Sequence, residues 1–340
     1  MRVLLTGMGG ELGTRVTNLL EADEQVEAIV GVDIDPPRGR IPEARFHRVD
    51  PRDRARTVAV VRDLEPTAVV HLGVYEPSAR VPARTAATLS EASALVALGA
   101  AAQCVSLDRI VVRSGIEVYG RPRGGPQRPD ETVHPRPTTP WGRTLARVEE
   151  VAAQAAVAAD VPVTILRLAP VVGPHIPSPL GRYLRLPAVP VSAVADPPFS
   201  LLHQEDAAAA VVRALHAGVD GTVNVVGPGA VTPFQAVRLG GRIPIPTLGL
   251  GWLAARAGCE LVGAPLPAHV IELLTRGRGA DGARGAEVLG RAPVRSTVDV
   301  VHDLYEWAEI VHLDVAHRPL DETASAKPMR SGWRVGSEDV

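Results

Sequence analysis

The sequence predicts an α/β fold built on a doubly wound, parallel sheet, with a smaller C-terminal lobe. Three observations support this fold class. Short apolar runs alternate with helical stretches through the first half of the chain, and the first run leads directly into a glycine-rich turn at 7–13. Hydrophobic residues make up 46% of the 340 residues, which is enough for a packed core. Continuous apolar strands separated by helices are typical of a parallel sheet covered on both faces.

Charge and cysteine content exclude several classes of partner. The 36 basic and 38 acidic residues give a formal charge of −2, so we expect no nucleic-acid partner. Arg256 interrupts the longest apolar run, 248–262, so we expect no membrane span. The two cysteines, Cys104 and Cys259, lack metal-ligand spacing, and no metal site is predicted. They suit a reducing, cytoplasmic location, and the start of the chain does not resemble a secretory signal.

The first elements follow from hydrophobic periodicity. The apolar run at 2–5 predicts a buried strand, and 11–22 predicts a helix because its apolar residues recur every three to four positions. A second strand is predicted at 26–32, ending at Asp33, and a third at 45–49. The alternation indicates the beginning of a βαβ arrangement.

The same alternation continues to residue 168. Helices are predicted at 54–64, where Pro66 stops the run, at 85–104, which is rich in Ala and Leu, and at 139–159. Apolar runs predict the intervening strands at 68–72, 109–112 and 161–168.

The pattern changes after Pro170, where Pro and Gly become frequent and the segments shorten. Helices are expected at 204–216, 233–239 and 298–311, with an extended segment at 221–226. We therefore predict a sheet domain at 1–170 and a smaller lobe at 171–316 that is partly interleaved with it. The polar, aperiodic segment 317–340 is predicted to be a flexible tail.

The glycine-rich turn predicts a dinucleotide site. Glycines at 7, 10 and 13 follow a strand and open a helix. Glycine permits the tight turn and lets backbone N–H groups approach a diphosphate, while the helix N-terminus adds partial positive charge. The predicted contacts are Gly7, Met8, Gly9, Gly10, Glu11, Leu12 and Gly13.

Two acidic residues bear on the choice of cofactor. Asp33 lies twenty residues after Gly13 at a strand end, where a carboxylate accepts hydrogen bonds from a ribose diol and repels a 2′-phosphate. NAD is therefore preferred over NADP, although Arg38 and Arg40 lie nearby and could weaken that preference. Asp50 could contact the adenine or be a solvated loop acid.

Seven segments together resemble the extended short-chain dehydrogenase/reductase family, the NAD-dependent epimerase/dehydratases. The turn TGMGGELG resembles the family's TGxxGxxG, and PTTPWG at 137–142 resembles its PxSPYG. The other matching segments are VDPRD (49–53), VVHLG (69–73), EVYG (117–120), LRLAPVVGP (166–174) and LLHQEDAAAAVV (201–212).

The resemblance implies a Rossmann-like, NAD-binding domain followed by a substrate lobe, and a nucleotide sugar or related small molecule as substrate. It adds Leu72 and Gly73 to the cofactor site. Members often pair through two long helices, so a homodimer through 85–104 and 139–159 is expected. The family relation suggests an oxidoreductase, an epimerase or a dehydratase.

The family's Tyr-x-x-x-Lys pair is replaced in this chain. PTTPWG places Trp141 at the tyrosine position and Leu145 at the lysine position. The family's tyrosine exchanges a proton with a substrate hydroxyl and needs a nearby cation to lower its pKa. Neither indole nor a leucine side chain can do this, and the chain's lone lysine, Lys327, lies in the predicted tail. Trp141 could instead close the pocket or stack on the nicotinamide, or simply fill the core.

Several residues are alternative candidates for acid/base chemistry. Glu117 occupies the position of the catalytic glutamate in the family's dehydratases, but its usual aspartate partner is Ile116. Tyr119 could donate a proton, and Ser114 lies one residue before the family's helper-hydroxyl position, Gly115.

Outside these positions, five further side chains are less specific candidates. They are His134, His175, Arg143, Arg147 and His203. The first two are loop histidines that could titrate or lie solvated at a pocket rim, and the two arginines could bind phosphate or lie on a helix face. For His203, a helix-capping or packing role is favoured. Two hypotheses remain open: an enzyme with a non-standard acid/base site, and an NAD-binding pseudoenzyme that acts as a sensor or partner-binding subunit.

Overall fold

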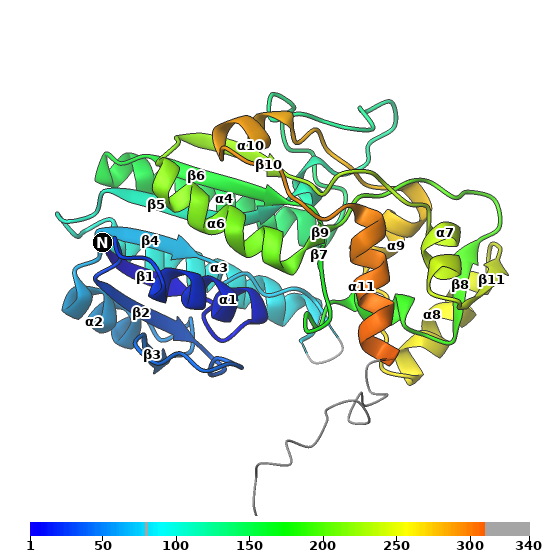
Figure 1. The fold of residues 1–340 in the computed structure, drawn as a ribbon, viewed down its shortest axis with the longest axis horizontal. Coiled ribbons are helices and arrows are strands. Elements are labelled where there is room, and N and C mark those ends of the chain that lie inside the picture. The colour runs from blue at the N-terminus through cyan, green and yellow to red at the C-terminus, as the bar shows by residue number, and fades with distance from the viewer. Residues whose placement is uncertain (79–80, 310–340) are drawn as a thin grey trace, which may run out of the picture.

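A seven-stranded parallel sheet forms the centre of the molecule in the computed structural model, which describes residues 1–78 and 81–309. The strand order is β10-β6-β5-β4-β1-β2-β3 (Figure 1). The strands of this sheet are β1 Arg2–Thr6, β2 Ala28–Asp33, β3 Arg45–Arg48, β4 Ala68–His71, β5 Arg109–Gly115, β6 Val163–Leu168 and β10 Gly221–Val225. The fold class predicted from the sequence is confirmed.

Burial explains why the central strands read as unbroken apolar runs. Leu4 of β1 pairs with Val30 of β2 on one side and with Val69 of β4 on the other. All three side chains are buried because both faces of the sheet carry helices. One face is covered by α1 Glu11–Glu21 and α6 Gln204–Ala217 (Figure 1). The opposite face carries α2 Arg54–Leu64, α3 Ala83–Ala101 and α4 Pro140–Ala159.

The order of the strands creates a switch point. The chain runs outward from β1 to β2 and β3, and then returns to β4 on the other side of β1. The loops after β1 and β4 therefore leave the sheet in opposite directions, and a crevice opens at the carboxyl ends of these strands. This is where doubly wound sheets bind their ligands.

The smaller lobe has a hydrophobic core of its own. Tyr183, Phe199, Leu201 and Leu304 are among its fully buried side chains. Its elements are β7 Val171–Val172, α5 Pro179–Leu184, β8 Ala188–Ser192, β9 Leu202–His203, α7 Pro233–Leu239, β11 Ile243–Thr247, α8 Gly251–Leu261, α9 Ala268–Arg276 and α11 Thr297–Glu309. The chain also returns to the sheet after residue 170, where it adds α6, β10 and the short helix α10 Ala283–Val288 beside β10.

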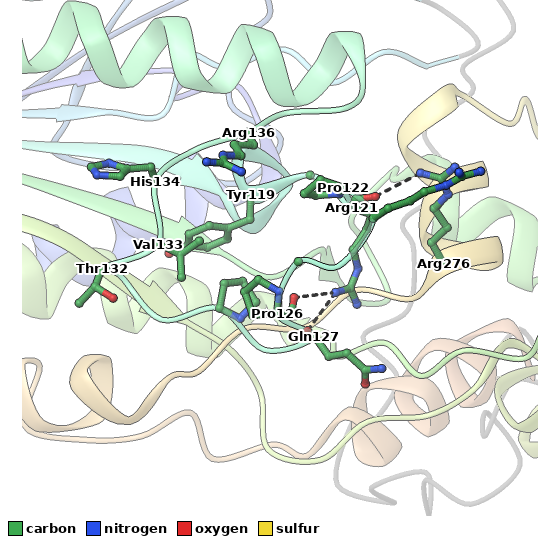
Figure 2. Close-up of a pocket in the computed structure, with 14 residues that line it drawn as sticks. Tyr119, Arg121, Pro122, Pro126, Gln127, Thr132, Val133, His134, Arg136 and Arg276 are labelled. Atoms are coloured by element: carbon green, nitrogen blue, oxygen red, sulfur yellow. Dashed lines mark hydrogen bonds between the residues drawn. The ribbon is translucent and has the colours of Figure 1, made fainter.

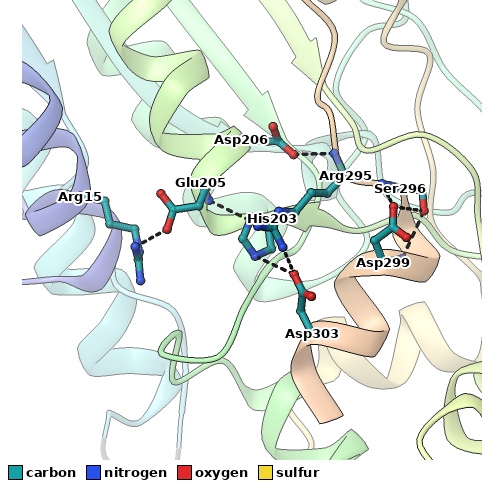
Figure 3. Close-up of polar contacts among 8 residues, drawn as sticks. All are labelled: Arg15, His203, Glu205, Asp206, Arg295, Ser296, Asp299 and Asp303. Carbon is teal, nitrogen blue, oxygen red and sulfur yellow. Dashed lines mark hydrogen bonds and ion pairs between the residues drawn. The ribbon is translucent and has the colours of Figure 1, made fainter. Parts of the chain in front are cut away.

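A polar cluster at the start of α6 ties the lobe to the sheet domain (Figure 3). The Nδ1 atom of His203 accepts a hydrogen bond from the Glu205 backbone, and its Nε2 lies 3.4 Å from Asp303 of α11. Glu205 also pairs with Arg15 of α1. His203 therefore caps α6, as the sequence predicts, and together with Glu205 it links this helix to α11 and α1.

Agreement with the predicted elements is close up to residue 168 and incomplete beyond it. Sequence reasoning missed β8 and β11, which form a separate parallel pair, because prolines interrupt both runs. Proline cannot donate to a ladder, so only a short edge pairing tolerates it. Strand β5 is longer than predicted and extends through Arg113 to Gly115. The predicted tail, 317–340, lies outside the described residues.

Candidate functional site

A cleft of about 350 Å³ opens at the carboxyl ends of the central strands. Its floor is the glycine turn after β1 together with the ends of β4, β5 and β6, and the lobe contributes its other wall through residues 176–182 and helix α9. The cleft therefore lies at the switch point and between the two hydrophobic cores.

The glycine turn forms one half of this cleft. Gly7 has φ +75°, and its N–H bonds to the Val32 carbonyl 3.0 Å away. A Cβ at Gly7 would lie 2.6 Å from the Leu72 backbone, and one at Gly13 would lie 2.1 Å from the Gly7 carbonyl oxygen. At Gly10, by contrast, the closest atom would be 3.4 Å away. Gly7 and Gly13 are required for packing, while Gly10 leaves space at the start of α1.

This space suits a diphosphate. Helix α1 begins after Gly10 without a side-chain cap. The N–H groups of its first turn, including those of Leu12 and Gly13, have no carbonyl acceptor within the helix. They face the cleft wall that both residues line, and the helix dipole adds partial positive charge there. The cradle fits the phosphates of a dinucleotide.

Asp33 lies beside this cradle at the end of β2. Its carboxylate is 7% exposed and accepts hydrogen bonds from the N–H groups of Gly9 and Ile34 and from the Tyr75 hydroxyl. Burial raises the pKa of Asp33, and these hydrogen bonds oppose that rise. The carboxylate is thus fixed in place at the cleft wall, where a ribose diol could bind it.

The other cofactor predictions fall into two groups. Glu11, Leu72 and Gly73 line the cleft, as does Arg38. Met8 is fully buried under the turn, so only its backbone shapes the site. Asp50 does not line the cleft, and its carboxylate pairs instead with Arg52, 2.6 Å away. The adenine contact predicted for Asp50 therefore remains a prediction.

The other half of the cleft contains Trp141, Leu145 and Glu117, and each of these side chains is buried. Trp141 and Leu145 lie on successive turns of α4. A Cβ at Gly115 would lie 2.4 Å from Oε2 of Glu117 and 3.1 Å from the Leu145 side chain. The Glu117 carboxylate therefore occupies the space beside Gly115, where the family resemblance places the helper hydroxyl.

Ser114 reaches the cleft, but its hydroxyl is bonded elsewhere. It donates to Glu149 at 2.5 Å, and Glu149 also forms a bidentate ion pair with Arg167 at 2.9 and 2.7 Å. The pair is buried behind the cleft, and its hydrogen bonds offset the cost of desolvating both charges. Ser114 therefore anchors this pair, and its predicted catalytic role remains untested.

The remaining sequence candidates lie outside the cleft. Tyr119 donates its hydroxyl to Asn224 at 2.8 Å, and burial raises its pKa. His134 and His175 are exposed and do not line the cleft. Arg143 is exposed, and Arg147 pairs with Glu150.

Several ionisable residues of the cleft escaped sequence reasoning, among them Arg113, Glu76 and His269. Arg113 lies on β5, and its pKa is lowered by burial while Glu76 and Glu117 oppose that effect. His269 of α9 bonds through Nε2 to Glu76, 2.9 Å away, and its ring centre lies 5.9 Å from that of Trp141. The position of Arg113 directly after an apolar run could have indicated a buried charge at the end of this strand. Nothing local to the sequence pairs Glu76 with His269, because 193 positions separate them.

Two further searches cover the described residues alone. Residues 1–78 and 81–309 contain no group of three or more His, Cys, Asp or Glu residues that could hold a metal ion. Within the same ranges, no helix is both long enough and apolar enough to cross a membrane.

Several known proteins resemble the chain. It is 30% identical to an uncharacterized protein of Mycobacterium tuberculosis, over 97% of this chain and 90% of the relative. Its fold is similar to UDP-glucose 4-epimerase of Thermotoga maritima, solved with UDP-glucose (20% identity, 92% and 99% of the two chains, TM-score 0.71). It is also similar to UDP-glucuronic acid 4-epimerase of Bacillus cereus, solved with UDP-glucuronic acid and NAD (18%, 92% and 100%, TM-score 0.71).

The family relation rests on the sequence itself. Residues 3–227 match the family described as the NAD dependent epimerase/dehydratase family, and this match includes the glycine turn, Asp33 and the Trp141 segment. The cofactor in that description agrees with the preference for NAD that Asp33 predicts. The chain therefore belongs to the NAD dependent epimerase/dehydratase family.

Proposed function

We propose that this protein catalyses an NAD-dependent epimerase or dehydratase reaction on a nucleotide sugar or a related small molecule, with Glu117 in place of the family's tyrosine–lysine pair. The observation that carries this proposal is the position of the Glu117 carboxylate. It is a buried, ionisable group in the cleft, next to the two side chains that replace the family pair.

The cofactor half fits NAD. When bound, NAD would accept hydride from the substrate and return it. The free N–H groups at the start of α1 would hold the diphosphate, and Asp33 would hold a ribose. Leu72 and Gly73 would lie along the same cleft wall toward the reaction centre.

Glu117 would exchange the proton. A general base must lie within hydrogen-bond reach of the group that it deprotonates, and its pKa must suit the working pH. The carboxylate is 6% exposed at the base of the cleft, and Arg113 lies close enough to interact with it electrostatically. This cation could also attract an anionic substrate.

The His269–Glu76 pair adds a second ionisable unit on the opposite wall. Glu76 belongs to the loop after β4, and His269 belongs to the lobe, so their hydrogen bond joins the two walls of the cleft beside Trp141. Imidazole can donate and accept a proton near neutral pH, and a carboxylate partner fixes the ring's orientation. We assign this pair the role of positioning the substrate over Glu117.

The substrate class rests on the shape and charge of the cleft and on the structural neighbours. The lobe wall contributes Arg182, and the strand floor contributes Arg113, so two cations face the space beyond the glycine turn. Two neighbours of the same fold hold UDP-sugars. A diphosphate ester with an apolar-faced sugar would match the arginines and the Trp141 ring.

A direct test combines binding with turnover. The purified chain is assayed with NAD and a panel of UDP-sugars and other nucleotide sugars, and epimerised or dehydrated products are identified by NMR. We expect product from the wild type, turnover lower by about 10² to 10⁴ in Glu117→Gln, and unchanged NAD affinity in this variant. Full activity of Glu117→Gln would overturn the role of Glu117, and absence of NAD binding would overturn the function.

A second function is favoured by Trp141 and Leu145 themselves. Both pack in the core like ordinary apolar residues, as expected for an NAD-binding pseudoenzyme that acts as a sensor or partner-binding subunit. The double variant Trp141→Tyr/Leu145→Lys separates the two functions. If the wild type binds NAD but is inactive on the whole panel, and the double variant gains activity, the pseudoenzyme is correct.

Assembly and location are also part of the proposal. We propose a homodimer that forms through the outer surfaces of α3 and α4, where Leu95 and Val157 are 50% and 83% exposed. Both cysteines are free, which suits a reducing, cytoplasmic location. Light scattering of the wild type and Leu95→Glu would test the dimer.

A further inference from the structure

A second cavity, of about 570 Å³, lies away from the cleft and shares no lining residue with it. The loop between the short 3-10 turn Ile116–Tyr119 and helix α4 forms most of its wall, and the end of α9 closes it with Arg276 (Figure 2). Tyr119 lies at its base. This loop contains no residue that we place in the reaction.

The charge of this cavity is of one sign. Its charged lining residues are Arg121, Arg123, Arg136 and Arg276, and no Asp or Glu lines it. His134 is a further lining residue, and its ring can donate a hydrogen bond. This concentration of arginine contrasts with the formal charge of −2 on the whole chain.

The arginines of this cavity are not neutralised by carboxylates. In the described part of the chain, none of the four takes part in an ion pair. Arg121 instead donates to the carbonyl oxygens of Gly277 and Gln127 at 2.7 and 3.0 Å, and Arg276 donates to the Arg121 carbonyl at 3.2 Å (Figure 2). These bonds fix two guanidinium groups in place and leave their charge uncompensated.

The nearby acids are bonded elsewhere. Asp130 accepts hydrogen bonds from Thr132, and Glu131 accepts one from the Asn224 backbone at 2.7 Å. Glu272 of α9 pairs with the buried Arg278. Burial and the charge of Arg278 both lower the pKa of Arg121, and Glu272 opposes this effect. An incoming anion would relieve this repulsion.

We propose that this cavity binds a small molecule with two or more phosphate groups, at a site separate from the catalytic cleft. Guanidinium groups present planar, paired donors that match phosphate oxygens, and several of them together favour a polyanion over a single phosphate. Pro122, Pro126 and Val133 provide apolar walls for the rest of the molecule. The inference does not depend on the function proposed for the cleft.

Isothermal titration calorimetry with pyrophosphate tests this site. The full chain is first saturated with NAD, so that the glycine turn is not available to the probe, in a buffer of about 0.15 M ionic strength. We expect saturable binding of one pyrophosphate. In the double variant Arg123→Gln/Arg136→Gln, the affinity should fall at least about tenfold, as expected for lost charge-assisted hydrogen bonds. Both side chains are exposed and make no hydrogen bond of their own, so the fold should be unaffected.

A matched control removes the same charge elsewhere. Arg128 lies in the same loop and Arg54 at the start of α2, and both are exposed and outside the cavity. Arg54→Gln/Arg128→Gln should keep the affinity within about twofold of the wild type, since neither side chain lines the cavity and exposed charges are screened at this ionic strength. The proposal would be overturned if pyrophosphate affinity were the same in the two double variants, whether reduced or unchanged. Absence of pyrophosphate binding by the wild type, or equally tight binding of citrate, would also overturn it.

Discussion

The two halves of the cleft differ in the groups that form them, main chain in one and side chains in the other. The cofactor half is formed by main chain: a turn that only glycine can make, free N–H groups, and Asp33 held by backbone donors. The reaction half is formed by side chains that come from β5, α4, the loop after β4 and α9. The first half matches the family's glycine pattern, whereas the second contains Trp141 and Leu145, the positions at which the sequence predicts that the family's tyrosine and lysine are replaced.

This difference shows how a site can change its chemistry without changing its fold. A backbone cradle depends on φ angles and close approaches, so a substitution at Gly13 would disturb packing as well as binding. A side-chain site can exchange one residue for another of similar volume and keep the core packed. Trp141 and Leu145 are both buried apolar residues, as such an exchange would require.

The largest expected effect is a loss of turnover with cofactor binding retained. Glu117→Gln keeps the shape of the side chain and removes its ability to accept a proton, so kcat should fall by about 10² to 10⁴, the usual contribution of general acid–base catalysis. NAD affinity, measured by calorimetry, should stay the same. His134→Gln is the control, since it is exposed and outside the cleft. A fall in NAD affinity that matches the fall in kcat would show that the two halves are not separable.

Acid should destabilise the sheet beneath the cofactor half. His71 is fully buried beside Thr6, 2.8 Å from its hydroxyl, and burial lowers the pKa of His71 from 6.5 to about 4. Between these pH values the unfolded chain binds a proton that the folded chain does not, so stability falls as pH falls. The loss should reach about 3 kcal/mol by pH 4.

Chemical denaturation at pH 7 and at pH 4.5 measures this loss. Other carboxyl groups also titrate in this range, so the comparison is with His71→Gln, whose pH dependence should be shallower by about 2 to 3 kcal/mol. Identical slopes for the wild type and the variant would mean that His71 does not titrate as its burial requires.

Two glycine variants sharpen the description of the cofactor half. Gly13→Ala places a methyl group against the Gly7 carbonyl and should cost about 1 to 3 kcal/mol of unfolding free energy, as overpacking does. Gly10→Ala meets no protein atom closer than 3.4 Å and should leave the melting temperature unchanged. Its methyl group would occupy the space of the diphosphate, so NAD affinity should fall at least about tenfold. Unchanged NAD affinity in Gly10→Ala would show that the diphosphate does not bind in this space.

The smallest effect concerns Tyr119, which sequence reasoning places among the catalytic candidates. Tyr119→Phe removes the hydrogen bond to Asn224 and should reduce stability by about 1 to 2 kcal/mol, because a buried acceptor loses its donor. The hydroxyl lies outside the cleft, so kcat should not change. A loss of kcat without loss of stability would show that Tyr119 takes part in the reaction.

The cofactor half could be predicted because its determinants are local. Gly7, Gly10 and Gly13 fall within seven residues, and Asp33 follows at the end of the next strand. The reaction half could be predicted only in part. Trp141 and Glu117 were recognised through the family's motifs, but Arg113 required the observed length of β5, and the Glu76–His269 pair required the lobe to fold over the sheet.

The amino-acid sequence by itself determined the order of strands and helices to residue 168 and the glycine turn, and it predicts the replacement of the family's tyrosine and lysine. These follow from periodicity and short motifs, which depend on neighbouring residues. Only the tertiary structure decided which ionisable groups share the cleft, that Tyr119 points elsewhere, and that four arginines line a second cavity. Those outcomes depend on packing between segments far apart in the chain, which the local pattern does not encode.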